Sequence, residues 1–355
     1  MNLEDLRSKI DQIDTKLVEL LNQRAQVVIE IGKAKGDGPV YAPDREKKVL
    51  ERIAAMNKGP LPDKTLVAVW RELMSGSFFL ERSLRIAFLG PQGSYTHTAA
   101  MRKFGQSVDY EAVTDIQGIF DEVTRGHCDL GVVPVENSAG GQVGETLDAF
   151  ADTNAMICAE VYMPIHHNLL ANCTLKEVQK VYSKPEVFLQ CKKWLSTTFN
   201  EANTIAAASS AKAAQMASQE QFAAAIGSDI AAELYGLKII CENIEDIGNN
   251  VTRFLIISKE DARPTGEDKT SILFSTAHKA GALADVLNVF KNREVNLTNI
   301  ESRPSKKRQR EYYFFVDCQG HRKDEKLIEC LSEIKQHCLQ LSVLGSYPKS
   351  DLILE

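Results

Sequence analysis

The spacing of apolar residues changes twice along this chain of 355 residues, and the two changes divide it into three parts. In the first part, leucine, isoleucine and valine recur at helical spacing over 3–35, which predicts a helix of roughly 45–50 Å at about 1.5 Å per residue. Glycine and proline at 36–39 end this pattern, and shorter helical patterns follow over 43–56 and 63–81. Three helices, one of them very long, cannot enclose a core alone. We therefore expect the long helix to pair with a second copy in an intertwined helical dimer.

Beyond Leu84 the pattern is that of an α/β protein, because short strand-like runs alternate with helical stretches. A polar stretch at 261–269 is expected to be a linker. After it come a strand, a helix, two strands, a helix and a strand, which is the order of a ferredoxin-like α+β domain. The strands expected before the linker are 84–90, 107–113, 130–135, 155–164, 180–183, 223–226, 237–240 and 254–258. Those expected after it are 270–275, 296–302, 311–318 and 339–347, with helices at 280–292 and 323–336.

A chain of this length is too long for one core, so we predict three domains, over 1–82, 84–260 and 269–355. Composition excludes several classes of protein. A net charge of −6 argues against broad binding to nucleic acid or anionic membranes, and no run of about 18 apolar residues is present to span a bilayer. The acidic, amphipathic start is unlike a signal peptide. Eight cysteines without a Cys-x-x-Cys pair fit neither a disulfide framework nor a zinc site, so we expect a reducing cytoplasm and no metal.

Several cations of the first part occupy polar positions of the long predicted helix. At about 100° per residue, Arg24 and Lys35 fall within roughly 20° of each other on one face. Arg7 precedes Arg24 by more than about 25 Å along the axis, which is too far to share a small ligand within one chain. In an antiparallel dimer, however, it could enter the partner's site. Spacing alone leaves open that all three are solvated surface charges.

Polar segments of the middle part lie at the ends of apolar strands. Glu136-Asn137-Ser138 directly follows such a strand, where an open α/β sheet presents groups to a ligand. A capping turn is the alternative. Gly90-Pro91-Gln92-Gly93-Ser94-Tyr95-Thr96 follows the first strand and is expected to start a helix, and its Gly-x-x-Gly loop is by itself most simply a turn. Asn250-Val251-Thr252-Arg253-Phe254 lies far downstream and is the third such segment.

Two segments of the last part are candidates for a small-molecule site. Gly281-Ala282-Leu283 stands at a strand-to-helix turn, where free backbone amides can accept a carboxylate. Glu301-Ser302-Arg303-Pro304 ends a predicted strand, and a purely structural junction is the alternative there. The basic run 306–310 is most simply an exposed hairpin loop rather than a nucleic-acid patch.

Together these segments make the chain resemble the bifunctional chorismate mutase–prephenate dehydratase family with a C-terminal ACT regulatory domain. In the first part the resemblance rests on Leu6-Arg7-x-x-Ile10, Arg24, Gly32-Lys33-Ala34-Lys35 and Asp44-Arg45-Glu46. It implies a multidomain fold: an all-α helical mutase domain, a two-lobed α/β dehydratase domain similar to periplasmic binding proteins, and an α+β ferredoxin-like ACT domain.

The resemblance also implies what the chain does. It points to a cytoplasmic enzyme without cofactors that converts chorismate to prephenate by a Claisen rearrangement, and prephenate to phenylpyruvate by decarboxylation and dehydration. Feedback inhibition by L-phenylalanine and a homodimer or homotetramer are implied as well. Arogenate is an alternative second substrate, which a fused mutase disfavours because it makes prephenate. A non-catalytic amino-acid-responsive binding protein is another, but it would not need Lys35, Glu46 and Thr252 together.

The rearrangement of chorismate is pericyclic, so the protein has only to hold the reactive conformer and to stabilise charge that develops on the ether oxygen. By resemblance, Lys35 donates to that oxygen and Glu46 takes the hydroxyl. Glu81 stands where many family members have glutamine, and it must be protonated to donate to the same oxygen. The expected mutase site comprises Arg7 from the partner subunit, Arg24, Lys35, Arg45, Glu46, Ser77 and Glu81.

Prephenate must lose carbon dioxide and its ring hydroxyl together. By resemblance, Thr252 donates a hydrogen bond to the departing hydroxyl and Arg253 anchors a carboxylate, while His167 has a structural role. The other residues expected in the dehydratase cleft are Glu136, Asn137, Ser138, Ser183 and Gln190. The residues expected to bind phenylalanine, partly across a subunit interface, are Gly281, Ala282, Leu283, Glu301, Ser302, Arg303 and Pro304.

Overall fold

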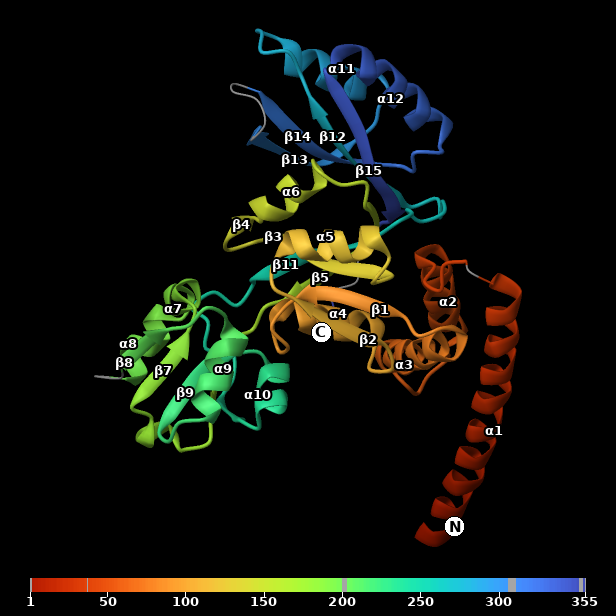
Figure 1. The fold of residues 1–355 in the computed structure, drawn as a ribbon. Helices are drawn as coiled ribbons and strands as arrows, with labels where there is room; N and C mark the ends of the chain where they lie inside the picture. Colours follow the sequence, from red (N-terminus) through yellow and green to blue (C-terminus); the bar gives the residue numbers. More distant parts are fainter. Residues whose placement is uncertain (1, 37, 200–202, 306–310, 351–353, 355) are drawn as a thin grey trace. The chain divides into compact units, whose positions relative to one another are not determined.

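The computed structural model describes residues 2–36, 38–199, 203–305, 311–350 and 354 (Figure 1). The basic run predicted to be a hairpin loop at 306–310, and one residue of the predicted helix end at 36–39, lie outside them. The chain forms two compact units. The first holds Met1–Ala42, Val49–Leu84 and Phe104–Asp109, and the second holds the remaining segments, Pro43–Lys48, Arg85–Lys103 and Tyr110–Glu355.

The first part of the chain is helical, as predicted, with α1 (Leu3–Lys35), α2 (Pro43–Met56) and α3 (Asp63–Glu81). A capping box between Asn2 and Asp5 begins α1. Helix α1 packs closely against α3, because a Cβ added to Gly32 would lie 3.2 Å from the Cα of Glu81. Most apolar side chains of α1 are exposed, which leaves the face that the sequence pattern predicted to be buried open to solvent. They include Leu3, Leu6, Ile10, Ile13, Leu17, Val18, Leu20, Leu21, Val27 and Ile31.

A mixed sheet forms the first lobe of the middle part. Its strands are β1 (Arg85–Leu89), β2 (Asp109–Val113), β3 (Leu130–Asn137), β4 (Gly141–Gln142), β5 (Met156–Pro164) and β11 (Val251–Ser258), with helices α4 (Tyr95–Phe104), α5 (Ile116–Arg125) and α6 (Gly144–Phe150). The order is β2-β1-β3-β11-β5, and β4 pairs with β3. Strand β11 lies between β3 and β5 and runs antiparallel to both, so the late segment 251–258 is inserted into a sheet built from much earlier residues.

The second lobe is inserted between β5 and β11. It holds a five-stranded sheet of order β10-β6-β9-β7-β8. Its elements are β6 (Asn168–Ala171), the 3-10 turn η1 (Leu175–Glu177), β7 (Lys180–Ser183), α7 (Pro185–Gln190), α8 (Lys192–Thr198), β8 (Asn203–Ala206), α9 (Ser210–Ser218), β9 (Ala223–Gly227), α10 (Asp229–Tyr235) and β10 (Lys238–Cys241). The sequence analysis did not predict the strands β4, β6 and β8, which have two to four residues each. The middle part is therefore two-lobed, and the chain crosses between the lobes twice.

The last part has the predicted ferredoxin-like order. Its elements are β12 (Asp268–Ser275), α11 (Ala282–Asn292), β13 (Leu297–Pro304), β14 (Tyr312–Gln319), α12 (Glu325–His337) and β15 (Gln340–Pro348), and the strands form an antiparallel sheet of order β13-β14-β12-β15. The two helices bury apolar residues against one face, among them Val286, Phe290 and Ile334.

The other face of the C-terminal sheet belongs to the same core as the first lobe. Leu273, Phe315 and Tyr347 lie in one buried cluster with Leu255 of β11. The approach is so close that a Cβ at position 345 would lie 2.2 Å from the carbonyl oxygen of Ile157, a residue of β5. The residues predicted as a regulatory domain therefore share a core with those predicted as a dehydratase domain.

The prediction of a linker over 261–269 is wrong at its C-terminal end. Asp268 and Lys269 are buried and begin β12. Ala262, also buried, donates its backbone N–H to the carbonyl of Ser346 at 3.0 Å. The junction is thus packed at Ala262 and at its C-terminal end, whereas Arg263, Pro264, Gly266 and Glu267 between them are exposed.

Candidate active sites and regulatory site

Four of the predicted mutase residues meet where α1 packs on α3. The Arg24 guanidinium donates to the Ser77 hydroxyl at 2.6 Å, and the Lys35 ammonium lies 2.5 Å from a Glu81 carboxylate oxygen. Partial burial lowers the pKa of Arg24. The two cations and their partners therefore form two pairs along one helix–helix contact. The helical spacing had predicted only that Arg24 and Lys35 share one face of the helix.

The other three predicted mutase residues lie near the start of α1 and at the start of α2. Arg7 lies near the start of α1, about 25 Å from Arg24 at about 1.5 Å per residue. Arg45 and Glu46 lie in the first turn of α2, a segment that belongs to the second compact unit. There the Glu46 carboxylate accepts from the Lys103 ammonium at 2.6 Å. The roles of these three residues in chorismate binding stay predictions.

The end of β3 and the start of β11 bring together several of the residues predicted for the dehydratase site. Thr252 is the register partner of Asn137, so their side chains lie on the same face of the sheet. The Asn137 amide nitrogen donates to the Thr252 hydroxyl and to the Asn250 side-chain oxygen, both at 2.7 Å. The Ser138 hydroxyl accepts from the backbone N–H of Val251 at 2.9 Å.

The orientation of Asn137 determines what the Thr252 hydroxyl can do. The Asn137 side-chain oxygen accepts from the backbone N–H groups of Ala139 and Gly140, at 3.0 and 2.7 Å, so its amide nitrogen must face Thr252. Because the threonine oxygen already accepts from Asn137, its own proton is free to donate elsewhere. Within the described ranges the Thr252 hydroxyl has no acceptor on the protein. The Thr252 side chain is buried, with 7% of its surface exposed.

Arg253 lies on the opposite face of the sheet from Thr252, since successive residues of a strand point to opposite sides. Its guanidinium is buried and contacts the carboxylates of Glu160 and Asp317 at 2.8 and 2.6 Å, and the Tyr347 hydroxyl at 3.0 Å. This geometry argues against the expected role of Arg253 as an anchor for the substrate carboxylate. Glu136 is the register partner of Arg253, so it also faces away from Thr252, contrary to its expected place in the cleft.

Ser183 and Gln190, the other expected cleft residues, make contacts within the second lobe and at its junction with the first. Ser183 is fully buried and donates to the Ile226 carbonyl at 3.3 Å. The Gln190 side chain lies 2.6 Å from Nε2 of His167, whose Nδ1 lies 2.7 Å from the Tyr95 hydroxyl. Burial lowers the pKa of His167, which keeps the ring neutral. Ser183 and Gln190 are thus placed by structural bonds, and their contact with substrate stays a prediction.

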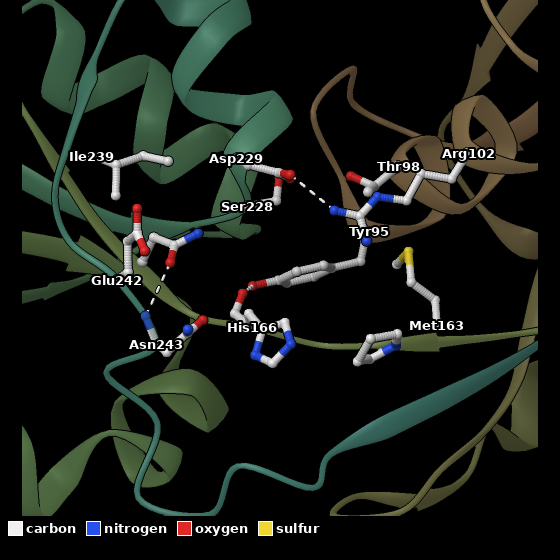
Figure 2. Close-up of a pocket in the computed structure, with 12 residues that line it drawn as sticks. Tyr95, Thr98, Arg102, Met163, His166, Ser228, Asp229, Ile239, Glu242 and Asn243 are labelled. Atoms are coloured by element: carbon white, nitrogen blue, oxygen red, sulfur yellow. Dashed lines mark hydrogen bonds and ion pairs between the residues drawn. The ribbon is translucent and has the colours of Figure 1, made fainter. Parts of the chain in front are cut away.

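A cavity of about 220 Å³ lies between α4, the end of β5 and the second lobe. Figure 2 shows Tyr95, Thr98 and Arg102 of α4 on one side, and Asp229, Ile239 and Glu242 on the other. The Arg102 guanidinium bridges the two sides by a 2.8 Å ion pair with Asp229. Met163, which lines this cavity, is the register partner of Thr252 and lies on the same face of the sheet.

Sequence reasoning missed Asn250 and Tyr95. Asn250 lies two residues before Thr252 in the same segment, and its bond to Asn137 makes it part of the cluster. The period-two spacing in Asn250-Val251-Thr252 was a signal that could have found it. Tyr95 begins α4 after the glycine-containing loop, and nothing in the local sequence distinguishes it from a packed aromatic residue.

The predicted phenylalanine-binding residues lie on two elements of the C-terminal part, the start of α11 and the end of β13. Gly281 caps the N-terminus of α11 with a φ of 84°, a conformation that favours glycine, and Ala282 is buried. On the edge strand β13, Arg303 contacts the Asp148 carboxylate of α6 through two nitrogens, at 3.2 and 3.1 Å. Ser302 is exposed and points to the other face. The structure thus splits the predicted motif between two faces of one sheet.

In the described part of the chain no helix is both long and apolar enough to cross a membrane. The same residues contain no group of three or more histidine, cysteine, aspartate or glutamate side chains arranged to hold a metal ion.

Three family models match the chain: chorismate mutase type II over 6–82, prephenate dehydratase over 86–262, and ACT domain over 270–336. A bifunctional chorismate mutase/prephenate dehydratase from Aquifex aeolicus (strain VF5) is 42% identical over 355 residues, which cover 98% of both chains. One from Pseudomonas aeruginosa is 42% identical and covers 99% of this chain and 98% of its own. A solved prephenate dehydratase from Arthrobacter aurescens in complex with L-Phe is 30% identical, with a TM-score of 0.70, over 77% of this chain and 93% of that one.

Proposed function

The chain belongs to the bifunctional chorismate mutase/prephenate dehydratases and has both enzyme activities, and from this premise we propose which residues carry the two reactions and their regulation. The first reaction rearranges chorismate to prephenate. The second converts prephenate to phenylpyruvate, carbon dioxide and water. We propose that L-phenylalanine, the amino acid made from phenylpyruvate, inhibits the second reaction by binding to the C-terminal part.

The role that we assign to Thr252 in the dehydratase reaction rests on one observation, the 2.7 Å hydrogen bond from Asn137 to the Thr252 hydroxyl. As the carboxylate carbon leaves as carbon dioxide, its bonding electrons aromatise the ring and expel the ring hydroxyl on the far side. A hydrogen bond from Thr252 stabilises the hydroxide as it forms, and a proton from solvent completes the water. A threonine hydroxyl is a weak acid, so its contribution is hydrogen-bond assistance rather than full proton transfer.

Asn137 sets the direction of that donation, and this can be tested. Asn137→Asp places a carboxylate beside the Thr252 hydroxyl, which then turns its proton toward the new carboxylate instead of the substrate. We expect dehydratase kcat to fall by roughly 10²-fold, the loss typical of one removed hydrogen-bond donor in such a site. Asn250→Asp, which changes the same cluster without touching the Thr252 hydroxyl, is the matched control. Equal losses in both variants would contradict the assignment.

In the mutase site we propose that Arg24 binds a carboxylate and that Lys35 donates to the ether oxygen. Lys35 is paired with Glu81 at 2.5 Å, so a bound substrate must exchange with, or add to, this pair. The charge that develops on the ether oxygen in the transition state is then met by a cation already held in place.

A homodimer or homotetramer is part of the proposal. It is supported by the row of exposed leucine, isoleucine and valine side chains on α1, which a second copy would cover. In such a pair, Arg7 of each chain lies near the other chain's Arg24 and Lys35, and Arg45 and Glu46 complete the site. Dissociation should then abolish mutase activity.

Inhibition by L-phenylalanine is supported by the match of the ACT domain over 270–336 and by the relative solved with L-Phe. We propose that its carboxylate binds the backbone amides near Gly281 and that residues of Glu301–Pro304 cover it.

The substrate of the second reaction is prephenate rather than arogenate, because the mutase part produces it. The eight free cysteines accord with a cytoplasmic location.

The direct test is to incubate the purified chain with chorismate and to follow prephenate and phenylpyruvate, with and without L-phenylalanine. We expect both products in sequence, and less phenylpyruvate when L-phenylalanine is present. Undiminished phenylpyruvate formation at saturating L-phenylalanine would overturn the regulatory part of the proposal alone.

A further inference from the structure

Four buried charges join the catalytic strand β11 to the C-terminal sheet. Arg253 contacts Glu160 of β5 at 2.8 Å and Asp317 of β14 at 2.6 Å, and Lys269 of β12 contacts the same Glu160 at 2.8 Å. Their side chains are between 0% and 10% exposed. Two cations and two anions therefore balance one another where the sheets meet.

Hydroxyl groups of the C-terminal sheet complete the cluster. The Tyr347 hydroxyl of β15 accepts from the Arg253 guanidinium at 3.0 Å and bonds the Ser271 hydroxyl of β12 at 2.7 Å. Ser271 also donates to the second oxygen of Asp317 at 2.5 Å. Arg253 is thus held by groups from β14 and β15, and these groups are linked to each other through β12.

The position of Arg253 in the chain gives this cluster a consequence for catalysis. It directly follows Thr252, and the two side chains leave β11 on opposite faces. Thr252 meets Asn137 on one face, and Arg253 meets the C-terminal sheet on the other. A charged hydrogen bond between close-packed strands tolerates little displacement. A shift of β14 or β15 therefore has to move Arg253, and with it the backbone that carries the Thr252 hydroxyl.

We propose that Arg253 is a positioning residue, which aligns Thr252 for the dehydratase reaction and transmits the state of the C-terminal sheet to it. This inference rests on the proposed function, in which Thr252 is the donor to the departing hydroxyl. L-phenylalanine controls the reaction through this residue by binding more tightly to an arrangement of the C-terminal sheet in which the Arg253–Asp317 contact is altered.

Two conservative variants test the proposal without opening a cavity. Asp317→Asn removes one charge that holds Arg253, and Tyr347→Phe removes one hydroxyl. Tyr162→Phe is the matched control, because its hydroxyl bonds Glu160 and Lys269 but not Arg253. For each chain the dehydratase kcat and KM are measured with and without saturating L-phenylalanine, with circular dichroism and thermal unfolding as the check on folding.

We expect Asp317→Asn and Tyr347→Phe to reduce the ratio of uninhibited to inhibited kcat by about 2- to 30-fold, the range by which coupling residues act. Uninhibited kcat should fall while KM for prephenate changes little. Tyr162→Phe should leave the ratio unchanged. A merely structural cluster would lower thermal stability in all three variants and leave the ratio as it is.

The outcomes separate this inference from the function on which it rests. A Thr252→Ala chain that keeps dehydratase activity overturns the proposed function. If Thr252→Ala is inactive while Asp317→Asn and Tyr347→Phe keep the original kcat and inhibition ratio, only the positioning role of Arg253 is overturned. The positioning role is also overturned if the ratio of uninhibited to inhibited kcat falls only because the variant no longer binds L-phenylalanine, as measured by calorimetry.

Discussion

The mutase residues and the dehydratase residues of this chain are held in place in opposite ways. Arg24 and Lys35 lie on a helix whose apolar side chains are largely exposed, with Leu20 at 59%. Thr252 lies near the start of β11, an interior strand that pairs with β3 and β5. Leu255 of the same strand shares a buried cluster with residues of the C-terminal sheet. On our proposal, the mutase site is completed by a second copy of the chain. The dehydratase site, by contrast, is supported by segments of one chain that lie far apart in sequence.

The strongest test of the comparison is Thr252→Ala. Removing the hydroxyl should reduce dehydratase kcat by roughly 10²- to 10⁴-fold, because the leaving hydroxide loses its donor. Mutase activity should stay near that of the unchanged chain, since the donor belongs to the other site. Separate assays with chorismate and with prephenate check this, and comparable losses of both activities in a folded variant would contradict the two-site assignment.

Lys35→Ala should have the reverse effect. Mutase kcat/KM should fall by roughly 10²- to 10³-fold, because the cation facing the ether oxygen is gone, and dehydratase activity should persist. The same variant sharpens the comparison when it is mixed with Arg7→Ala under conditions that exchange subunits. A mixed dimer contains one site with both residues intact, so about a quarter of the original mutase activity should return. No recovery after verified exchange would mean that the site is not shared.

The regulatory residues predict a smaller effect. Ser302→Ala and Arg303→Ala should each weaken inhibition by L-phenylalanine about tenfold, within the usual range of allosteric coupling, with little change in uninhibited kcat. Asp148→Asn, which loosens the Arg303 contact from the side of α6, separates the two functions of that arginine. Calorimetry that gives the same L-phenylalanine affinity for both variants and the unchanged chain would remove Glu301–Pro304 from the proposed site.

The smallest expected effect concerns Glu81. A glutamine at this position donates a hydrogen bond without needing a proton, and it releases Lys35 from the ion pair. Mutase kcat/KM of the unchanged chain should therefore fall toward high pH, while that of Glu81→Gln should fall less. The measurement is kcat/KM from about pH 5 to 9 for both proteins. Parallel profiles would show that Glu81 is not a donor to the ether oxygen.

Much of the fold could be predicted because its signals are local. The helical period over 3–35 and the caps and prolines that follow were sufficient for α1, α2 and α3. The alternation of strands and helices after Leu84 located most of the two lobes, and the order of the last six elements was correct. Short buried strands such as β6 were missed because four apolar residues carry no period of their own.

The sequence by itself determined which residue types the chain offers for each reaction. It placed Asn137 just after a predicted strand and Thr252 just before one. Only the tertiary structure decided which of the neighbours Thr252 and Arg253 is covered by the C-terminal sheet. Adjacent residues of a strand always diverge, but the face that is open depends on what packs against the sheet. Here the C-terminal sheet covers the Arg253 face with Asp317 and Tyr347, contacts made across more than sixty residues of sequence that no local pattern encodes.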